Sequence, residues 1–194
     1  MRKTKEETIL TIHLLINTAK HHFTEKGYAD VSLEDIAQEA KLTRGAVYHH
    51  FKNKKGLFLA VFEDIQKEIG DQVERKAMKS DDLWEQLLNG CRAFLDTASQ
   101  PNHKRILLID GPAVLGWDTF RLMDRKYSMN SLSELLTEMQ KQKLIEASSI
   151  DALTHTLSGA MNEAVLWIAE KNDREKSINE VMTVLTALMG GVRK

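Results

Sequence analysis

The sequence predicts an all-α protein that begins with a three-helix unit containing a helix-turn-helix and continues as a larger helical part. Apolar residues recur at intervals of three and four through most of the 194 residues. Only two prolines occur, where average usage would give roughly ten. Turn residues do not recur at the short spacing that β-sheets require. Together these three observations favour helices throughout.

The first expected helix ends at Gly27, where the helical spacing of apolar residues stops and glycine can close the last turn. Ser32 then starts a very short second helix, with Asp35 three residues on as a capping box. Thr43 can cap a third helix that runs to about Phe51. The apolar face of the first helix is expected to consist of Ile9, Ile12, Ile16, Ala19 and Phe23.

Asn53 can cap a fourth and longer helix, and only Lys41 and Leu42 connect the second helix to the third. Two short helices joined by so tight a turn, with a longer helix before and after, have the dimensions of a helix-turn-helix. The apolar face of the fourth helix is expected to contain Leu57, Phe58, Val61, Phe62, Ile65 and Ile69.

The remaining residues continue as helices, expected at about 81–99, near 106, at 117–143, at 150–170 and from 173 to the end. Charge divides unevenly between the two parts. Residues 1–55 hold 10 Lys and Arg against 7 Asp and Glu, whereas the rest holds 17 against 21. We therefore expect two domains, 1–55 and 56–194, linked by the fourth helix from residue 54. The first is the part suited to a polyanion, although its excess of positive charge is small.

Cations stand at the amino ends of the third and fourth helices, where the helix dipole favours anions. Arg44 follows Thr43, and Lys54 and Lys55 follow Asn53, whereas most of the other helices open with acidic residues. A phosphate would satisfy the dipole, the free N–H groups and the cations together. Two such helix ends could therefore bind adjacent stretches of a nucleic-acid backbone.

The third helix carries further groups that suit contact with DNA. Tyr48, His49 and His50 lie on it and Lys52 just past it, while small Gly45 would let its amino end approach bases closely. The major groove admits one helix, and Arg44 could read guanine edges. The alternative is an ordinary solvated surface turn.

The segment from Leu42 to Leu57, L-T-R-G-A-V-Y-H-H-F-K-N-K-K-G-L, resembles the signature of the TetR/AcrR family of bacterial transcriptional regulators. The preceding G-Y-A-D-V-S-L-E-D-I-A-Q-E-A at Gly27–Ala40 resembles the same family. The likeness covers roughly the first sixty residues. It implies a helix-turn-helix that binds an inverted-repeat DNA operator, a helical core that binds a small-molecule effector, and two terminal helices that pair in a homodimer.

The resemblance also assigns roles to single residues. Tyr48 and Lys54 fall where the family contacts phosphates, and Ser32 where the preceding helix touches the backbone. Val47 and Phe51 are core-facing, and Lys41 departs from the glycine that the family places in the turn. If that turn needs a left-handed residue, Lys41 costs about 1 kcal/mol. The full expected DNA-binding set is Ser32, Thr43, Arg44, Gly45, Tyr48, His49, His50, Lys52 and Lys54.

The second part of the chain is expected to provide the effector cavity and the dimer contacts. Aromatic and soft side chains suit a ligand cavity, although each could simply be core, and a break at Asp110–Pro112 suits a bend over it. The expected effector-binding residues are Cys91, Phe94, Trp117, Phe120, Met123 and Trp167. Apolar stripes on the last two helices supply the expected dimer contacts, which are Leu153, Leu157, Met161, Ile168, Val181, Leu185 and Leu188.

Several classes of protein are disfavoured. No apolar stretch is long enough to cross a bilayer and the first residues lack the core of a signal peptide, which predicts a cytoplasmic protein. A single cysteine, Cys91, rules out an intrachain disulfide. Metal-ligand spacings, cofactor motifs and a catalytic nucleophile are not apparent, so we expect neither a metal nor a cofactor nor an enzyme. The open alternative is an all-helical small-molecule-binding dimer that does not bind DNA.

Overall fold

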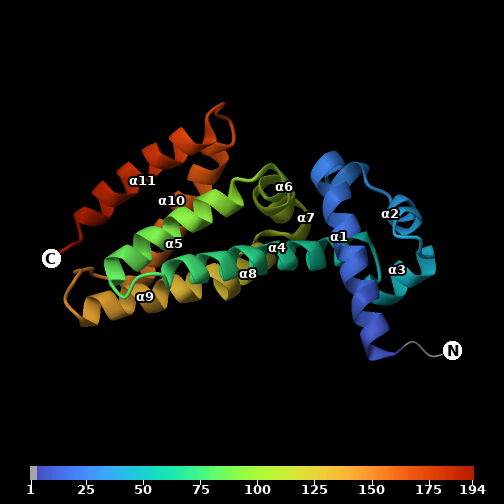
Figure 1. The fold of residues 1–194 in the computed structure, drawn as a ribbon, viewed down its shortest axis with the longest axis horizontal. Coiled ribbons are helices and arrows are strands. Elements are labelled where there is room, and N and C mark those ends of the chain that lie inside the picture. The colour runs from blue at the N-terminus through green and yellow to red at the C-terminus, as the bar shows by residue number, and fades with distance from the viewer. Residues whose placement is uncertain (1–3) are drawn as a thin grey trace. The chain divides into compact units, whose positions relative to one another are not determined.

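The computed structural model describes residues 4–194, and within that range the chain is helical with no β-strand (Figure 1). The prediction of an all-α protein is confirmed. The chain divides into two compact units. One contains the residues up to Ile65 together with Pro101–Phe120, and the other contains Gln66–Gln100 and Arg121–Lys194. The predicted boundary at residue 55 separates a DNA-binding part from an effector-binding and dimerisation part, and it stays a prediction.

The first unit contains the expected helix-turn-helix. Helix α1 spans Lys5–Asp30, α2 spans Leu33–Glu39, α3 spans Arg44–Phe51, and α4, Lys54–Ala77, starts in this unit. Three predicted caps are present. The Ser32 and Thr43 hydroxyls accept hydrogen bonds from the N–H groups of Asp35 and Ala46, at 3.0 and 3.2 Å. The amide oxygen of Asn53 accepts from the N–H of Gly56 at 2.8 Å. A reciprocal capping box is formed by Thr4 and Glu7 at the start of α1.

The predicted apolar face of α1 is wrong over its first half. Ile9 is 45% exposed, and Ile12 and Ile16 are only partly buried. The face that packs inward instead carries Thr11, Leu15, Thr18, Ala19, His22 and Phe23. Threonine can be buried in a helix because its hydroxyl bonds a carbonyl one turn back, as the 2.7 Å bond from Thr11 Oγ1 to the Glu7 carbonyl illustrates. Apolar spacing therefore located the helix but misjudged its rotation.

Gly27 interrupts α1 rather than ending it. Its φ of +79° makes a kink, after which the chain continues to Asp30. The segment Pro101–Leu115, in the same unit, fixes this kink. It comprises α6 (Pro101–Lys104), the π-helical η1 (Arg105–Asp110) and α7 (Gly111–Leu115). Arg105 donates to the carbonyls of Glu25 and Lys26, and the Asp110 carboxylate accepts from the N–H of Tyr28 at 3.0 Å.

The second unit is a bundle formed by α5 (Leu83–Ala98), α9 (Asn130–Lys141), α10 (Ile150–Ile168) and α11 (Arg174–Gly190), together with the end of α4 (Figure 1). The helix expected at 117–143 is divided into α8 (Trp117–Asp124), the π-helical η2 (Arg125–Met129) and α9. Helix α8 itself starts in the first unit. The bend expected at Asp110–Pro112 is wrong. Those residues are helical, and the chain breaks instead at Gly116, whose φ is +86°.

Across residues 4–194, every helix is too short or too polar to cross a membrane. In the same range no cluster of His, Cys, Asp or Glu side chains is arranged to hold a metal ion.

Candidate functional site

One face of α3 is exposed and rich in groups that can form hydrogen bonds. Arg44, Gly45, Tyr48 and His49 are all exposed on it, while Val47 on the opposite face is fully buried. Of the remaining predicted DNA-binding residues, Thr43 caps α3 and Lys52 follows it. Ser32 and His50 are partly buried. The helix-turn-helix thus places the predicted residues on or beside one exposed helix face.

Arg44 at the start of α3 has partners within its own unit. Its guanidinium forms an ion pair with Glu34 of α2 and donates to the Tyr48 hydroxyl at 2.9 Å. It also lies 5.1 Å from the centre of the Tyr48 ring. The hydrogen bond to Tyr48 and the charge of Glu34 raise the pKa of Arg44. Because both ends of the ion pair are more than half exposed, it stabilises the fold little and can exchange for another anion.

Lys54 at the start of α4 also has partners within its own unit. Its ammonium donates to the Ala29 carbonyl at 2.9 Å and lies 4.5 Å from the centre of the Tyr28 ring. Lys55, the next residue, is exposed. The amino ends of α3 and α4 therefore carry cations as predicted, but two of them are held by neighbouring groups of the chain itself.

The turn between α2 and α3 contains the predicted strain. Lys41 has a φ of +54°, the left-handed conformation that favours glycine. Lys52, which ends α3, also has a positive φ, of +66°. Two lysines thus occupy strained positions on either side of the exposed helix.

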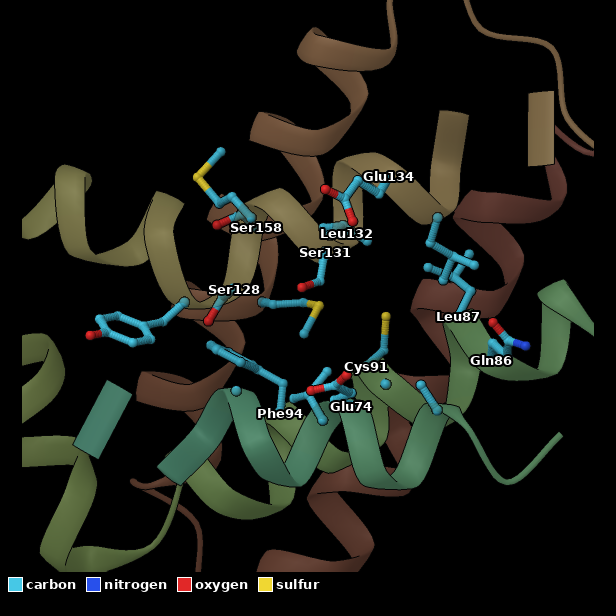
Figure 2. A pocket seen from close by; sticks show the side chains of 18 of the residues that line it. Glu74, Gln86, Leu87, Cys91, Phe94, Ser128, Ser131, Leu132, Glu134 and Ser158 are labelled. Atoms are coloured by element: carbon cyan, nitrogen blue, oxygen red, sulfur yellow. The ribbon is translucent and has the colours of Figure 1, made fainter. Parts of the chain in front are cut away.

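A cavity of about 360 Å³ lies in the second unit, between α4, α5, η2, α9 and α10. Its size falls within the range typical of ligand pockets. Cys91 and Phe94 extend into it from α5, and Ser128 of η2 and Ser131 of α9 face them (Figure 2). The Ser128 hydroxyl is buried and is one of the few such atoms in residues 4–194 that have no hydrogen-bond partner.

Two of the six predicted effector residues, Cys91 and Phe94, line this cavity. The other four are not among its lining residues. Trp117 is 62% exposed and stacks on Phe120, which is buried in the first unit. Met123 is partly buried, and Trp167 is 38% exposed. They were expected in the cavity because aromatic and soft side chains suit a ligand site, but these four side chains lie elsewhere in the two units.

The sequence reasoning missed the polar part of the lining, which includes Glu74, Ser128 and Glu134. Acidic residues on an amphipathic helix normally face water, so they gave no signal. A usable signal was an interior glycine in two of the expected helices, Gly70 in the one that follows Asn53 and Gly90 in the one at about 81–99, because such a glycine often marks close packing. A Cβ at Gly70 would lie 2.7 Å from the Tyr127 carbonyl oxygen of η2, and Gly90 lines the cavity.

Burial changes the ionisation of two lining groups. It raises the pKa of the Cys91 thiol to about 12, so this side chain is neutral and unreactive at neutral pH. It also raises the pKa of Asp124, whose carboxylate accepts a bond from Ser158 at 3.2 Å and lies 3.9 Å from Arg121.

The predicted dimer contacts separate into two groups. Leu157, Met161, Ile168 and Leu185 are at most 6% exposed, because they pack α10 and α11 into their own unit. They are therefore not on a surface open to a partner. Leu188 is 65% exposed, and Leu153 and Val181 are partly exposed. Val184 at 58% and Trp167 at 38% are further apolar side chains exposed on these helices.

Sequence comparison places both parts of the chain in one family. Residues 15–61 match the profile "Bacterial regulatory proteins, tetR family". Residues 84–192 match the profile "Tetracyclin repressor-like, C-terminal domain", which alone covers more than half of the chain. The chain belongs to the TetR family of bacterial transcriptional regulators. The resemblance first seen in residues 27–57 is thus confirmed, and it extends to the carboxyl-terminal helices.

Individual TetR-family proteins are similar over different lengths. The Transposon Tn10 TetC protein of Escherichia coli is 28% identical over 77% of this chain and 75% of its own. The HTH-type transcriptional regulator AcrR of Shigella flexneri is 40% identical over 36% of this chain, but the match spans only 33% of AcrR. The crystal structure of a TetR-family transcriptional regulator from Pectobacterium atrosepticum is 34% identical, covers 98% of both chains and superposes with a TM-score of 0.80.

Proposed function

We propose that this TetR-family member is a cytoplasmic, ligand-responsive repressor that binds an inverted-repeat operator in double-stranded DNA as a homodimer. The observation that carries the proposal is the exposed face of α3, where Arg44, Tyr48 and His49 lie around the small Gly45. A helix of this kind fits the major groove, and a two-fold dimer presents two of them about 34–36 Å apart.

Each residue of the set has a specific role in this proposal. Arg44 and His49 meet base edges, and the Tyr48 hydroxyl and the Lys54 ammonium meet phosphates. Gly45 allows close approach, because it carries no side chain and the nearest neighbour of a Cβ there would be 3.7 Å away. Ser32, Thr43, His50 and Lys52 lie beside these groups and contact the sugar-phosphate backbone.

The effector occupies the cavity of the second unit in this proposal. Helix α4 is continuous from Lys54 to Ala77, and Gly70, Val73 and Glu74 near its end line the cavity. About 24 Å of helix separates Lys54 from Gly70 at 1.5 Å per residue. A ligand that binds one tilt of α4 more tightly than another would change the spacing of the two recognition helices, and the change in operator affinity is limited by that difference.

The exposed apolar residues of α10 and α11 form the dimer contact in this proposal. Trp167, Val184 and Leu188 supply apolar surface, with the partly exposed Leu153 and Val181 beside them. Aromatic and aliphatic anchors of this kind are common at the centre of homodimer interfaces.

Selection of bound fragments from random duplex DNA tests the proposal. We expect an inverted repeat whose half-site centres lie about one helical turn apart. Arg44→Ala should then reduce affinity for the selected sequence by roughly 10-fold or more, because a good base contact is worth about 1–3 kcal/mol. Arg75→Ala is the matched control, since Arg75 is exposed at the other end of α4.

Equal binding by the two variants would contradict the recognition role of α3. Failure to enrich any duplex sequence, with a stable dimer that still binds small molecules, would favour the alternative of a helical binding protein without DNA affinity.

A further inference from the structure

The cavity of the second unit is lined by acidic but not by basic side chains. Among the lining residues, all of which lie in the described part of the chain, are the carboxylates of Glu74, Asp124, Glu134 and Glu138. The same lining contains no lysine, arginine or histidine. An anionic ligand would therefore find no counter-charge there, whereas a cationic one would.

Two of these carboxylates are already compensated within the chain. Asp124 is buried, accepts a bond from Ser158 and lies near Arg121. Glu138 accepts a hydrogen bond from the Gln142 amide at 3.0 Å and is 3.6 Å from the Lys141 ammonium. These contacts satisfy much of their charge and leave little for a ligand.

Glu74 and Glu134 are different. Both are exposed, and within residues 4–194 neither side chain forms a hydrogen bond or an ion pair. Glu74 projects from α4 and Glu134 from α9, on different sides of the cavity (Figure 2). They place two uncompensated negative charges where the cavity meets water.

The interior of the cavity is mostly apolar. Leu87 and Phe94 of α5, Met129 of η2 and Met161 of α10 supply aliphatic, aromatic and thioether surface. The Ser128 hydroxyl, buried without a partner, adds one hydrogen-bonding group. Its position in a π-helical segment is notable, because such segments often occur at ligand sites.

We propose that this cavity binds an organic cation with an apolar body, whose positive group lies between Glu74 and Glu134 and whose body packs against Phe94, Met129 and Met161. The inference rests on the proposed role of the cavity as the effector site and adds the chemical class of the ligand. An apolar body larger than a few rings would not fit in about 360 Å³.

Three probes with one body and different end groups test the charge preference directly. They are 6-phenylhexyltrimethylammonium, the neutral 6-phenyl-1-hexanol and the anionic 7-phenylheptanoate, titrated calorimetrically into the full chain without DNA. We expect affinity to fall in that order. A charge about 4 Å from a carboxylate in water gains roughly fivefold in affinity, and two carboxylates gain about 25-fold. The preference should weaken as salt is added, because exposed charges are screened.

Substitutions identify the carboxylates responsible. Glu74→Gln combined with Glu134→Gln should reduce the affinity of the ammonium probe by about 25-fold and leave that of the alcohol unchanged. Asp71→Asn is the matched control, because Asp71 is exposed on α4 and does not line the cavity. Thermal unfolding of each variant checks that the fold is retained, as expected for exposed side chains.

Equal or tighter binding of the carboxylate or alcohol probe would overturn the inference, as would no binding of the ammonium probe up to its solubility limit. An unchanged preference in the double variant would also overturn it. Ammonium binding with the expected preference, but without any effect on operator affinity, would support the ligand class and contradict the effector role. The two proposals can therefore fail separately.

Discussion

Replacing Lys54 tests two roles of this residue, one in stabilising the fold and one in contacting a DNA phosphate. Its ammonium donates to the Ala29 carbonyl and lies over the Tyr28 ring, so it holds the end of α1 in place. Both interactions are partly open to solvent, and their loss should reduce the free energy of unfolding by about 1 kcal/mol. For a chain of this length, that corresponds to a fall of roughly 2–4 °C in Tm.

The same substitution should change the salt dependence of DNA binding if Lys54 also contacts a phosphate. Each phosphate contact contributes about 0.9 to the slope of log affinity against log salt, so Lys54→Ala should reduce the slope by about two for a dimer. Affinity should fall alike for all duplex sequences. Fluorescence anisotropy with labelled duplexes over a series of salt concentrations measures both quantities.

Two further variants make the Lys54 experiment decisive. Lys54→Arg retains the charge and should retain the slope. Lys67→Ala removes the same charge from an exposed position on α4, about 20 Å along the helix or two Debye lengths away at 0.1 M salt, and should leave the slope unchanged. A lower Tm with an unaltered slope in Lys54→Ala would refute the phosphate contact and leave Lys54 a purely structural residue.

Three other substitutions follow from the backbone and from burial. Gly27→Ala should lower the free energy of unfolding by more than about 1 kcal/mol, because φ is +79° and the added Cβ would displace the Arg105 guanidinium; chemical denaturation measures this. Lys41→Gly should raise the free energy of unfolding by up to about 1 kcal/mol, since the φ of Lys41 is +54°. Unchanged stability would show that the turn is unstrained. Burial raises the pKa of Cys91 from 9.0 to about 12, so the neutral thiol stabilises the folded state fully below pH 9. The stability difference between the native chain and Cys91→Ala should therefore narrow as pH rises from 9 towards 12.

Local signals in the sequence were sufficient to predict that the first four helices form and where the second, third and fourth begin. The caps at Ser32, Thr43 and Asn53 and the short turn at Lys41 are decided by residues a few positions apart. The rotation of α1 was not predictable in this way. Its inner face uses the polar Thr11 and Thr18, and the Thr11 hydroxyl bonds within the helix, so apolar spacing alone chose the wrong side over the first half of α1.

The lining of the cavity could not be predicted from the sequence for a different reason. It depends on which helices meet, and no local pattern indicates that η2 approaches α4 so closely that only glycine fits at position 70. The aromatic residues expected there were chosen by type, but Trp117 is 62% and Trp167 38% exposed, and neither lines the cavity. Cys91 and Phe94 both line the cavity, and they lie one turn apart on a single well-defined helix. Residues on one helix keep their spacing whatever the tertiary arrangement.

The internal partners of Arg44 and Lys54 bear on how such a surface discriminates between DNA sequences. Cations held in place by Glu34 and by the Ala29 carbonyl lose little side-chain freedom when they exchange these partners for DNA. The carboxylate of Glu34, however, remains next to Arg44 and repels phosphates, which weakens attraction to any duplex. Charge alone contributes little to the DNA affinity of such a surface, because the excess of positive charge in residues 1–55 is small. Affinity must then depend on fitted contacts of α3, and binding to unrelated sequences should be correspondingly poor.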